Sequence, residues 1–329
     1  MPLTAVALAL ALLAAPAQAD PITIKLATLA PEGTTWYNSL REMGERWTAI
    51  SGGKVQLRIY PGGVAGNEGT QVRKMRIGQL QAAALSNLGL LDIDPGPQVI
   101  NTPMLIEDYA TLDCTMAKLT PVLEARLAEK GFVALNWSEA GWAYYFNREV
   151  VRTPADAARY KVYAWDGDPA AVLAFRQAGL NPVVIQSVEV IPSLQSGLID
   201  GFFTTPLAAL SLQWFALSPH QLDVPWAPLT GATVITKEAW DAIPAEYHAP
   251  FMQAAREIGE KNKAEIRRQD RAAVKVMQKY GLTVETVDEA TRQQWVAMAR
   301  GIYPAIRGPV VPTDLFDLTT RTVEACKAR

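Results

Sequence analysis

The chain has 329 residues, which is about two domains at roughly 150 residues each. Its composition is 49% hydrophobic and 19% charged, so an intrinsically disordered chain is not indicated. Lys and Arg number 31 against 33 Asp and Glu, for a net charge of −2. This balance argues against a nucleic-acid partner and against strong recruitment to anionic lipid.

The first 19 residues have the pattern of a secretory signal peptide. Residues 5–15 are an uninterrupted apolar run, shorter than the roughly 20 residues that cross a bilayer. Ala17-Gln18-Ala19 follows as a small-x-small cleavage site, although no Lys or Arg precedes the run. A buried N-terminal helix is the alternative interpretation. We expect cleavage before Asp20 and a periplasmic protein without a membrane span.

Cys114 and Cys326 are the two cysteines of the chain. An oxidising compartment would allow them to form a disulfide, and two separate buried thiols are the alternative. Neither His220 nor His248 lies near either cysteine in the sequence, so we expect no metal site.

Strands and helices alternate in the first half of the mature chain. Apolar residues three and four apart predict amphipathic helices, and polar–apolar alternation predicts strands with one buried face. The expected elements are a strand at 22–26, a helix at 36–50, a strand at 54–60, a helix at 70–77 and a strand at 78–85.

The same order returns at strand 161–165, helix 169–179, strand 182–185, helix 188–197 and strand 198–203. Two such units predict α/β layers around a mainly parallel sheet. Residues 247–280 read as one long polar helix, which at about 1.5 Å per residue reaches across two domains.

Signatures of catalysis are weak. Gly62 to Gly69 lacks the Gly-Lys-Ser/Thr ending of a phosphate-binding loop, and residues 92–96 lack the later carboxylate of a calcium loop. Asp166 and Asp168 form a close carboxylate pair, but a solvated turn or a helix cap is the simpler interpretation. We expect no enzyme activity, no catalytic residue and no cofactor.

Several segments together resemble one family, the DctP-type substrate-binding proteins of TRAP (tripartite ATP-independent periplasmic) transporters. The matching segments are Ile24 to Ala27, Ser51 to Val55, Tyr60 to Gly63, Val72 to Ala83, Arg152 to Asp156, Gly179 to Val183 and Val190 to Gly201.

The resemblance implies a two-domain periplasmic binding protein fold in which the long helix braces both domains. We expect residues 20–140 and 226–268 to form domain I, and residues 141–225 and 269–329 to form domain II. The ligand would bind between the domains and be delivered to the TRAP membrane permease subunits. A tetratricopeptide-repeat protein is a further candidate partner.

This chain departs from the family at the positions that hold a carboxylate. Family members that bind organic acids usually carry an Arg where this sequence has Tyr163, and a second Arg near Ala143. The polar stretch expected after Asp200-Gly201 is replaced by Phe202-Phe203-Thr204-Thr205-Pro206.

These changes predict an aromatic cleft for a hydrophobic or weakly polar ligand, because aromatic rings offer a large apolar area. The candidate ligand-binding residues are Trp142, Tyr144, Tyr163, Trp165, Phe202, Phe203, Thr204 and Trp214. Core packing is the alternative for each ring. Two further hypotheses stay open: an organic acid anchored by Arg148, Arg152 or Lys161, and a periplasmic ligand-sensing or scaffold protein without a transport role.

Overall fold

The computed structural model describes residues 20–165 and 168–328. The predicted signal peptide, residues 1–19, lies outside the described residues. Among those described, no helix combines the length and apolar character needed to span a membrane.

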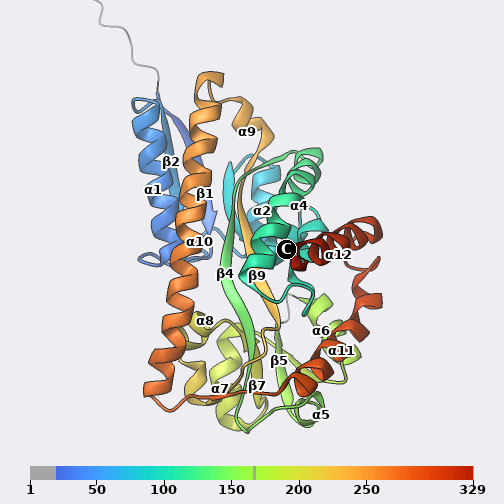
Figure 1. Cartoon of the computed structure of the whole chain (residues 1–329). Coiled ribbons are helices and arrows are strands. Elements are labelled where there is room, and N and C mark those ends of the chain that lie inside the picture. The colour runs from blue at the N-terminus through green and yellow to red at the C-terminus, as the bar shows by residue number, and fades with distance from the viewer. Residues whose placement is uncertain (1–19, 166–167, 329) are drawn as a thin grey trace, which may run out of the picture.

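Two lobes lie one above the other, joined by elements that run through both (Figure 1). The first lobe holds three strands and the helices around them: β1 (Ile22–Thr28), α1 (Thr35–Ile50), β2 (Val55–Tyr60), α2 (Glu68–Arg76), β3 (Ala82–Ser86), α3 (Asn87–Leu91), the 3₁₀ helix η1 (Gly96–Asn101) and α4 (Tyr109–Glu129).

The second lobe repeats this alternation, with α5 (Pro154–Ala157), β5 (Lys161–Trp165), α6 (Pro169–Gln177), β6 (Asn181–Ile185), η2 (Ser187–Glu189), α7 (Val190–Ser196), β7 (Gly201–Thr204), α8 (Pro206–Ser211), η3 (Trp214–Ala216) and β8 (His220–Leu222).

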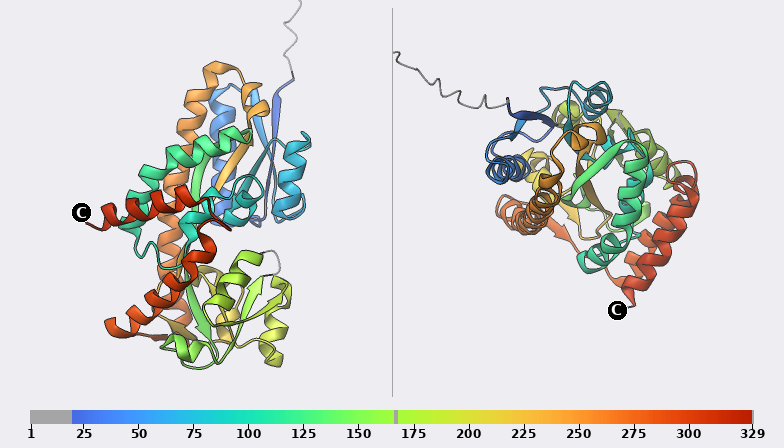
Figure 2. Two further views of the ribbon diagram at one scale, coloured as in Figure 1. Left: turned by 90° about the vertical axis from the view of Figure 1, so that its right-hand side faces the viewer. Right: turned by 90° about the horizontal axis from the view of Figure 1, so that it is seen from above.

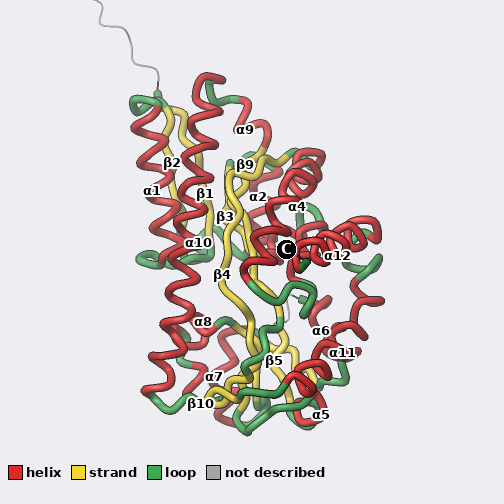
Figure 3. The backbone as a smooth tube through the Cα atoms, in the orientation of Figure 1, coloured by secondary structure: helices red, strands yellow, loops and turns green. Residues whose placement is uncertain are grey.

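The remaining elements link or cover the lobes: β4 (Phe132–Asn147), β9 (Ala227–Thr236), α9 (Lys237–Asp241), η4 (Ala245–Tyr247), α10 (His248–Lys279), β10 (Thr283–Glu285), α11 (Glu289–Ile306) and α12 (Thr313–Lys327). The α/β fold class, with a long helix that braces both lobes, is therefore confirmed (Figure 3).

The described strands form a ten-stranded sheet whose main path is β2-β1-β3-β9-β4-β7-β5-β6. Pairing is parallel between β1 and its two neighbours and between β5 and its two neighbours. Every pair formed by β9, and the pairs of β4 with β7 and β8, are antiparallel. The expected mainly parallel sheet is thus found inside each lobe, while the connecting strands run antiparallel to their neighbours.

Local sequence explains where α1 begins and which of its faces is buried. The Thr34 side chain caps α1 by accepting a hydrogen bond from the backbone N–H of Tyr37. Leu40, Met43 and Trp47 then recur at three- and four-residue steps and are buried. The Trp47 ring stacks on Phe251 of α10 with ring centroids 4.4 Å apart, which anchors the long helix to the first lobe.

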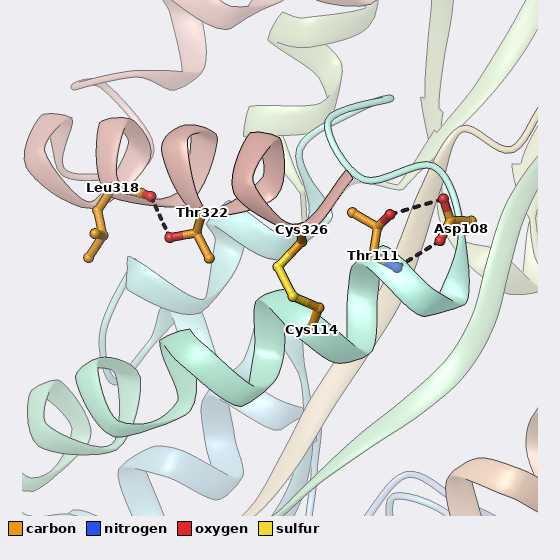
Figure 4. The surroundings of a disulfide bond; sticks show 6 residues. All are labelled: Asp108, Thr111, Cys114, Leu318, Thr322 and Cys326. Carbon is orange, nitrogen blue, oxygen red and sulfur yellow. Dashed lines mark hydrogen bonds between the residues drawn. A yellow bond between two sulfur atoms is a disulfide. The ribbon is translucent and has the colours of Figure 1, made fainter. Parts of the chain in front are cut away.

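Cys114 of α4 and Cys326 of α12 form a disulfide, with Cα atoms 5.9 Å apart (Figure 4). Of the two alternatives open from the sequence, the structure has the paired one. The bond holds α12 against α4 of the first lobe, although we expected residues 269–329 in domain II. The domain boundaries themselves stay a prediction.

We expect the variant Cys114→Ser/Cys326→Ser to unfold more easily than the oxidised protein. The bond closes a loop with a sequence separation of 212 residues. Its loss should lower the free energy of unfolding by about 2–5 kcal/mol, chiefly because the unfolded chain regains freedom. Guanidinium unfolding monitored by circular dichroism measures this difference. Equal midpoints and slopes for the two proteins would contradict the prediction.

Candidate ligand-binding cleft

Strand β4 passes through both lobes and separates two cavities. Side chains alternate across a strand, so Ala143 and Tyr145 face one side while Trp142 and Tyr144 face the other. Ala143 lines a cavity of about 220 Å³ between the lobes, which we name the interlobe cavity. Trp142 and Tyr144 line a separate cavity of about 290 Å³, which we name the hinge cavity.

The walls of the interlobe cavity come from three parts of the chain. The first lobe contributes mainly polar side chains from β3–α3 and η1, and the second lobe contributes apolar side chains from α6 and β7. Residues of β4, the start of β9 and the end of α11, with the segments next to β9 and α11, complete the lining. The lining residues are Asn87, Gln98, Asn101, Thr102, Pro103, Ala143, Asp168, Ala171, Ala174, Phe175, Phe203, Trp226, Ala227, Leu229, Ile306 and Val310.

Phe203 is the centre of the aromatic wall. Its ring centroid lies 4.8 Å from that of Tyr145, 5.2 Å from that of Phe175 and 5.0 Å from that of Trp226. Packing on three sides fixes the ring. A molecule in the cavity would therefore meet a preformed apolar surface.

The opposite wall carries neutral amides that are held in place by hydrogen bonds. Asn87 Nδ2 donates to Gln98 Oε1 at 3.1 Å, and Gln98 Nε2 donates back to the Asn87 carbonyl. Asn101 Nδ2 donates to the carbonyl of Pro228, and its Oδ1 accepts from Thr230 Oγ1 at 3.3 Å. These amides offer oriented dipoles without a net charge.

Among the described lining residues, Asp168 is the one charged group. Its Oδ1 accepts the backbone N–H of Ala171 at 2.9 Å and so caps α6, as its position in a loop before a helix predicted.

The three cations that we considered as replacement anchors have other environments. Arg152 pairs with Glu285 at 2.8 Å, Arg148 donates to the Leu194 carbonyl, and the Lys161 side chain is exposed.

The structure separates the eight predicted ligand-binding residues. Phe203 alone among them lines the interlobe cavity, whereas Trp142 and Tyr144 line the hinge cavity. Trp165 and Thr204 are half-buried at strand ends and line neither cavity.

The remaining three rings pack on one another in the second lobe. Phe202 is fully buried, with its centroid 5.2 Å from that of Trp214. Tyr163 meets Trp214 edge-on at 5.7 Å, and its hydroxyl lies 2.9 Å from Ser187 Oγ. These residues are therefore spread over several places in the structure, since neighbouring residues of a strand face opposite sides of the sheet, and their role in ligand binding stays a prediction.

Sequence reasoning missed several residues of the cavity. Phe175 lies on the predicted helix 169–179, and its place on that helix's apolar face was the available signal. Trp226, Ile306 and Val310 lie far from the motifs that suggested the cleft, and no local pattern relates them to Phe203.

The hinge cavity contains a buried carboxylate, Asp270 of α10, which is 6% exposed. Asp270 Oδ1 accepts the backbone N–H of Leu207 at 2.9 Å, and the carboxylate also accepts the N–H of Trp142. Removal from water nevertheless raises the pKa of Asp270 to about 6, since the ionised form loses its hydration. Burial likewise raises the pKa of Tyr144 to about 12.

This raised pKa predicts a pH-dependent stability. The folded state holds the Asp270 proton more tightly than the unfolded chain does. Protonated Asp270 therefore adds to the free energy of unfolding below about pH 4, and this contribution is lost as the pH rises through about 6. The shift of about 2 units corresponds to roughly 3 kcal/mol. The variant Asp270→Asn has no proton to lose at this position. We therefore expect the free energy of unfolding of the wild type, relative to that of the variant, to fall by up to about 3 kcal/mol between pH 4 and 7. Urea unfolding of both proteins at each pH measures this difference. A difference that stays constant over this range would contradict the prediction.

Known proteins similar to this chain share one family and one fold. The family model described as bacterial extracellular solute-binding protein, family 7 (DctP) matches residues 26–307. The 2,3-diketo-L-gulonate-binding periplasmic protein YiaO of Escherichia coli is 25% identical over 71% of this chain and 72% of its own length. The C4-dicarboxylate-binding periplasmic protein DctP of Rhodobacter capsulatus is 24% identical, over 85% of this chain and 84% of that protein.

Solved structures agree with this assignment at the level of the fold. A TRAP periplasmic solute-binding protein of Roseobacter denitrificans with bound β-D-glucuronate has a TM-score of 0.82 at 18% identity, and covers 92% of this chain and 99% of its own. One from Shewanella oneidensis with bound succinate has a TM-score of 0.81 at 19% identity, with the same coverage of both chains. Because the family model spans most of its length, this chain belongs to family 7 of the bacterial extracellular solute-binding proteins, the DctP family.

Proposed function

We propose that this protein is the periplasmic solute-binding component of a TRAP transporter and that its solute is a small, neutral and largely apolar molecule. The solute would bind in the interlobe cavity, and the two lobes would close around it by hinge motion. The closed protein would then deliver it to the membrane permease subunits. The transport role is supported by family membership and by similarity to TRAP solute-binding structures.

The observation that carries the ligand class is the charge of the cavity wall. No Lys, Arg or His occurs among the described residues that line it, and the carboxylate of Asp168 there caps α6. A carboxylate is held best by the planar guanidinium of Arg, through paired charge-assisted hydrogen bonds. An organic acid in this cavity would lose its hydration without such compensation.

Contact with the apolar wall supplies the free energy that would bind a neutral solute. Burial of about 200 Å² of apolar surface contributes roughly 5 kcal/mol before the cost of association is subtracted. Phe203, Phe175 and Trp226 contribute apolar surface to this wall. Asn87 and Asn101 on the opposite wall suit one or two neutral polar groups of the solute. A molecule with an apolar body and a polar end fits both walls.

We assign the main binding role to Phe203, while Trp142, Tyr144, Tyr163, Trp165, Phe202, Thr204 and Trp214 stay candidates for contacts made after the lobes close. The proposed closure would move residues 20–140 and 226–268 against residues 141–225 and 269–329. A tetratricopeptide-repeat partner also stays a prediction.

An organic acid is the second candidate, because the related structures contain bound glucuronate and succinate. That function requires a Lys or Arg to enter the cavity when the lobes close. A ligand-sensing protein without a permease is a third candidate, which a TRAP permease gene beside this one would exclude.

The ligand class can be tested directly on protein purified without refolding. We expect organic extraction and mass spectrometry to release a stoichiometric neutral molecule with a substantial apolar part. Phe203→Ala should retain less of it, since the affinity loss expected from a truncated ring is about tenfold or more. Val188→Ala is the matched control, because Val188 is 86% exposed and lies outside the cavity. A stoichiometric carboxylate retained equally by all three proteins would contradict the proposed ligand class.

A further inference from the structure

The C-terminal residues 289–327, which we name the C-terminal strap, connect the second lobe to the first. The strap consists of α11, an elbow at residues 307–312 and α12 (Figure 2). Trp295 Nε1 of α11 donates to the Arg152 carbonyl of the second lobe at 2.8 Å, and α11 packs on α6. At its other end, α12 packs on α4 and η1. The strap is thus a further link between the lobes, outside the sheet.

The end of α11 and the elbow that follows it form one wall of the interlobe cavity. Ile306 and Val310 line the cavity beside the second-lobe wall that contains Phe175. Hydrogen bonds hold the turn, as Gly308 N donates to the Val311 carbonyl at 2.7 Å. Arg307 pairs with Asp317 through two contacts of 2.7 Å. Val310 therefore lies on a hydrogen-bonded turn, and Ile306 lies at the end of α11 directly before it.

Contacts of α11 and α12 with the first lobe position the elbow relative to the cavity wall that carries Asn87, Gln98 and Asn101. The Tyr303 hydroxyl donates to the Pro103 carbonyl at 3.0 Å, and Tyr303 meets the Phe316 ring edge-on at 5.5 Å. Glu107 pairs with Lys327 at the end of α12 and with Arg292 near the start of α11. The Cys114–Cys326 disulfide adds a covalent tie at the end of the strap (Figure 4).

We propose that the C-terminal strap completes the interlobe cavity and sets how tightly the cavity holds a neutral solute, with Ile306 and Val310 as contact residues and the disulfide as the bond that positions them. This inference rests on the proposed binding of a neutral, largely apolar solute. A strap released from α4 would let the elbow move away from Phe175 and expose the apolar wall to water. The cavity would then retain such a solute less well.

A neutral fluorescent probe tests the inference. Prodan (6-propionyl-2-dimethylaminonaphthalene) has an apolar ring system and one carbonyl, and its emission shifts when it leaves water. We expect oxidised wild type to bind it, and Ile306→Asn and Val310→Asn each to bind about tenfold more weakly, as for the loss of one buried apolar contact. Val188→Asn, at an exposed site, should bind like wild type.

Cys114→Ser/Cys326→Ser tests the tie. We expect the probe to dissociate faster from this variant, and faster from wild type after reduction, while far-ultraviolet circular dichroism shows a folded chain at the assay temperature. Faster release from the folded, untied protein supports the positioning role. Release at the wild-type rate overturns it.

The outcomes separate this inference from the proposed function. If Phe203→Ala weakens probe binding but both elbow variants bind like wild type, the role of the strap is overturned and the cavity stands. If oxidised wild type does not bind the probe, the proposed apolar cavity is contradicted as well.

Discussion

The antiparallel pairing of β4 with β9 is the constraint on which the rest of the structure depends. The register runs from Phe132 opposite Thr236 to Ala143 opposite Ala227, with irregularities near Asn136 and Gly141. The end of β4 then pairs with β7 and β8 of the second lobe. One strand therefore links the two lobes, and its alternation decides which side chains face the interlobe cavity.

Sequence patterns predicted the first strands and helices of each lobe, because short alternating and amphipathic segments are local features, whereas α4 was not predicted. Strand β5 has the expected bounds, and α10 lies within one residue of the expected helix at each end. The binding site was harder to predict. Phe202 and Phe203 are adjacent in sequence, yet one is fully buried in the second-lobe core and the other lines the cavity. Alternation along β7 places them on opposite faces of the sheet, and the pairing of β7 with β4 fixes which face each one takes.

The contribution of the strap shows a second limit of sequence reasoning. Ile306 and Val310 reach the cavity because α11 packs on the second lobe while α12 is tied to the first. Neither contact has a local signature. The two cysteines were visible in the sequence, but their partnership depends on a packing between α4 and α12 that no spacing rule specifies.

The two walls of the interlobe cavity differ in chemistry and complement one another. Aromatic rings provide apolar area on one wall, and hydrogen-bonded amides provide neutral dipoles on the other. The family relationship supports the transport role. The wall chemistry is our reason for proposing a solute unlike the glucuronate and succinate bound in the related structures.

A crystal structure of the protein purified without refolding tests the central claim most directly. The account predicts closed lobes and a neutral molecule in the interlobe cavity, with its apolar part against Phe203 and its polar end toward Asn101. A carboxylate held in the cavity by a Lys or Arg side chain would contradict it.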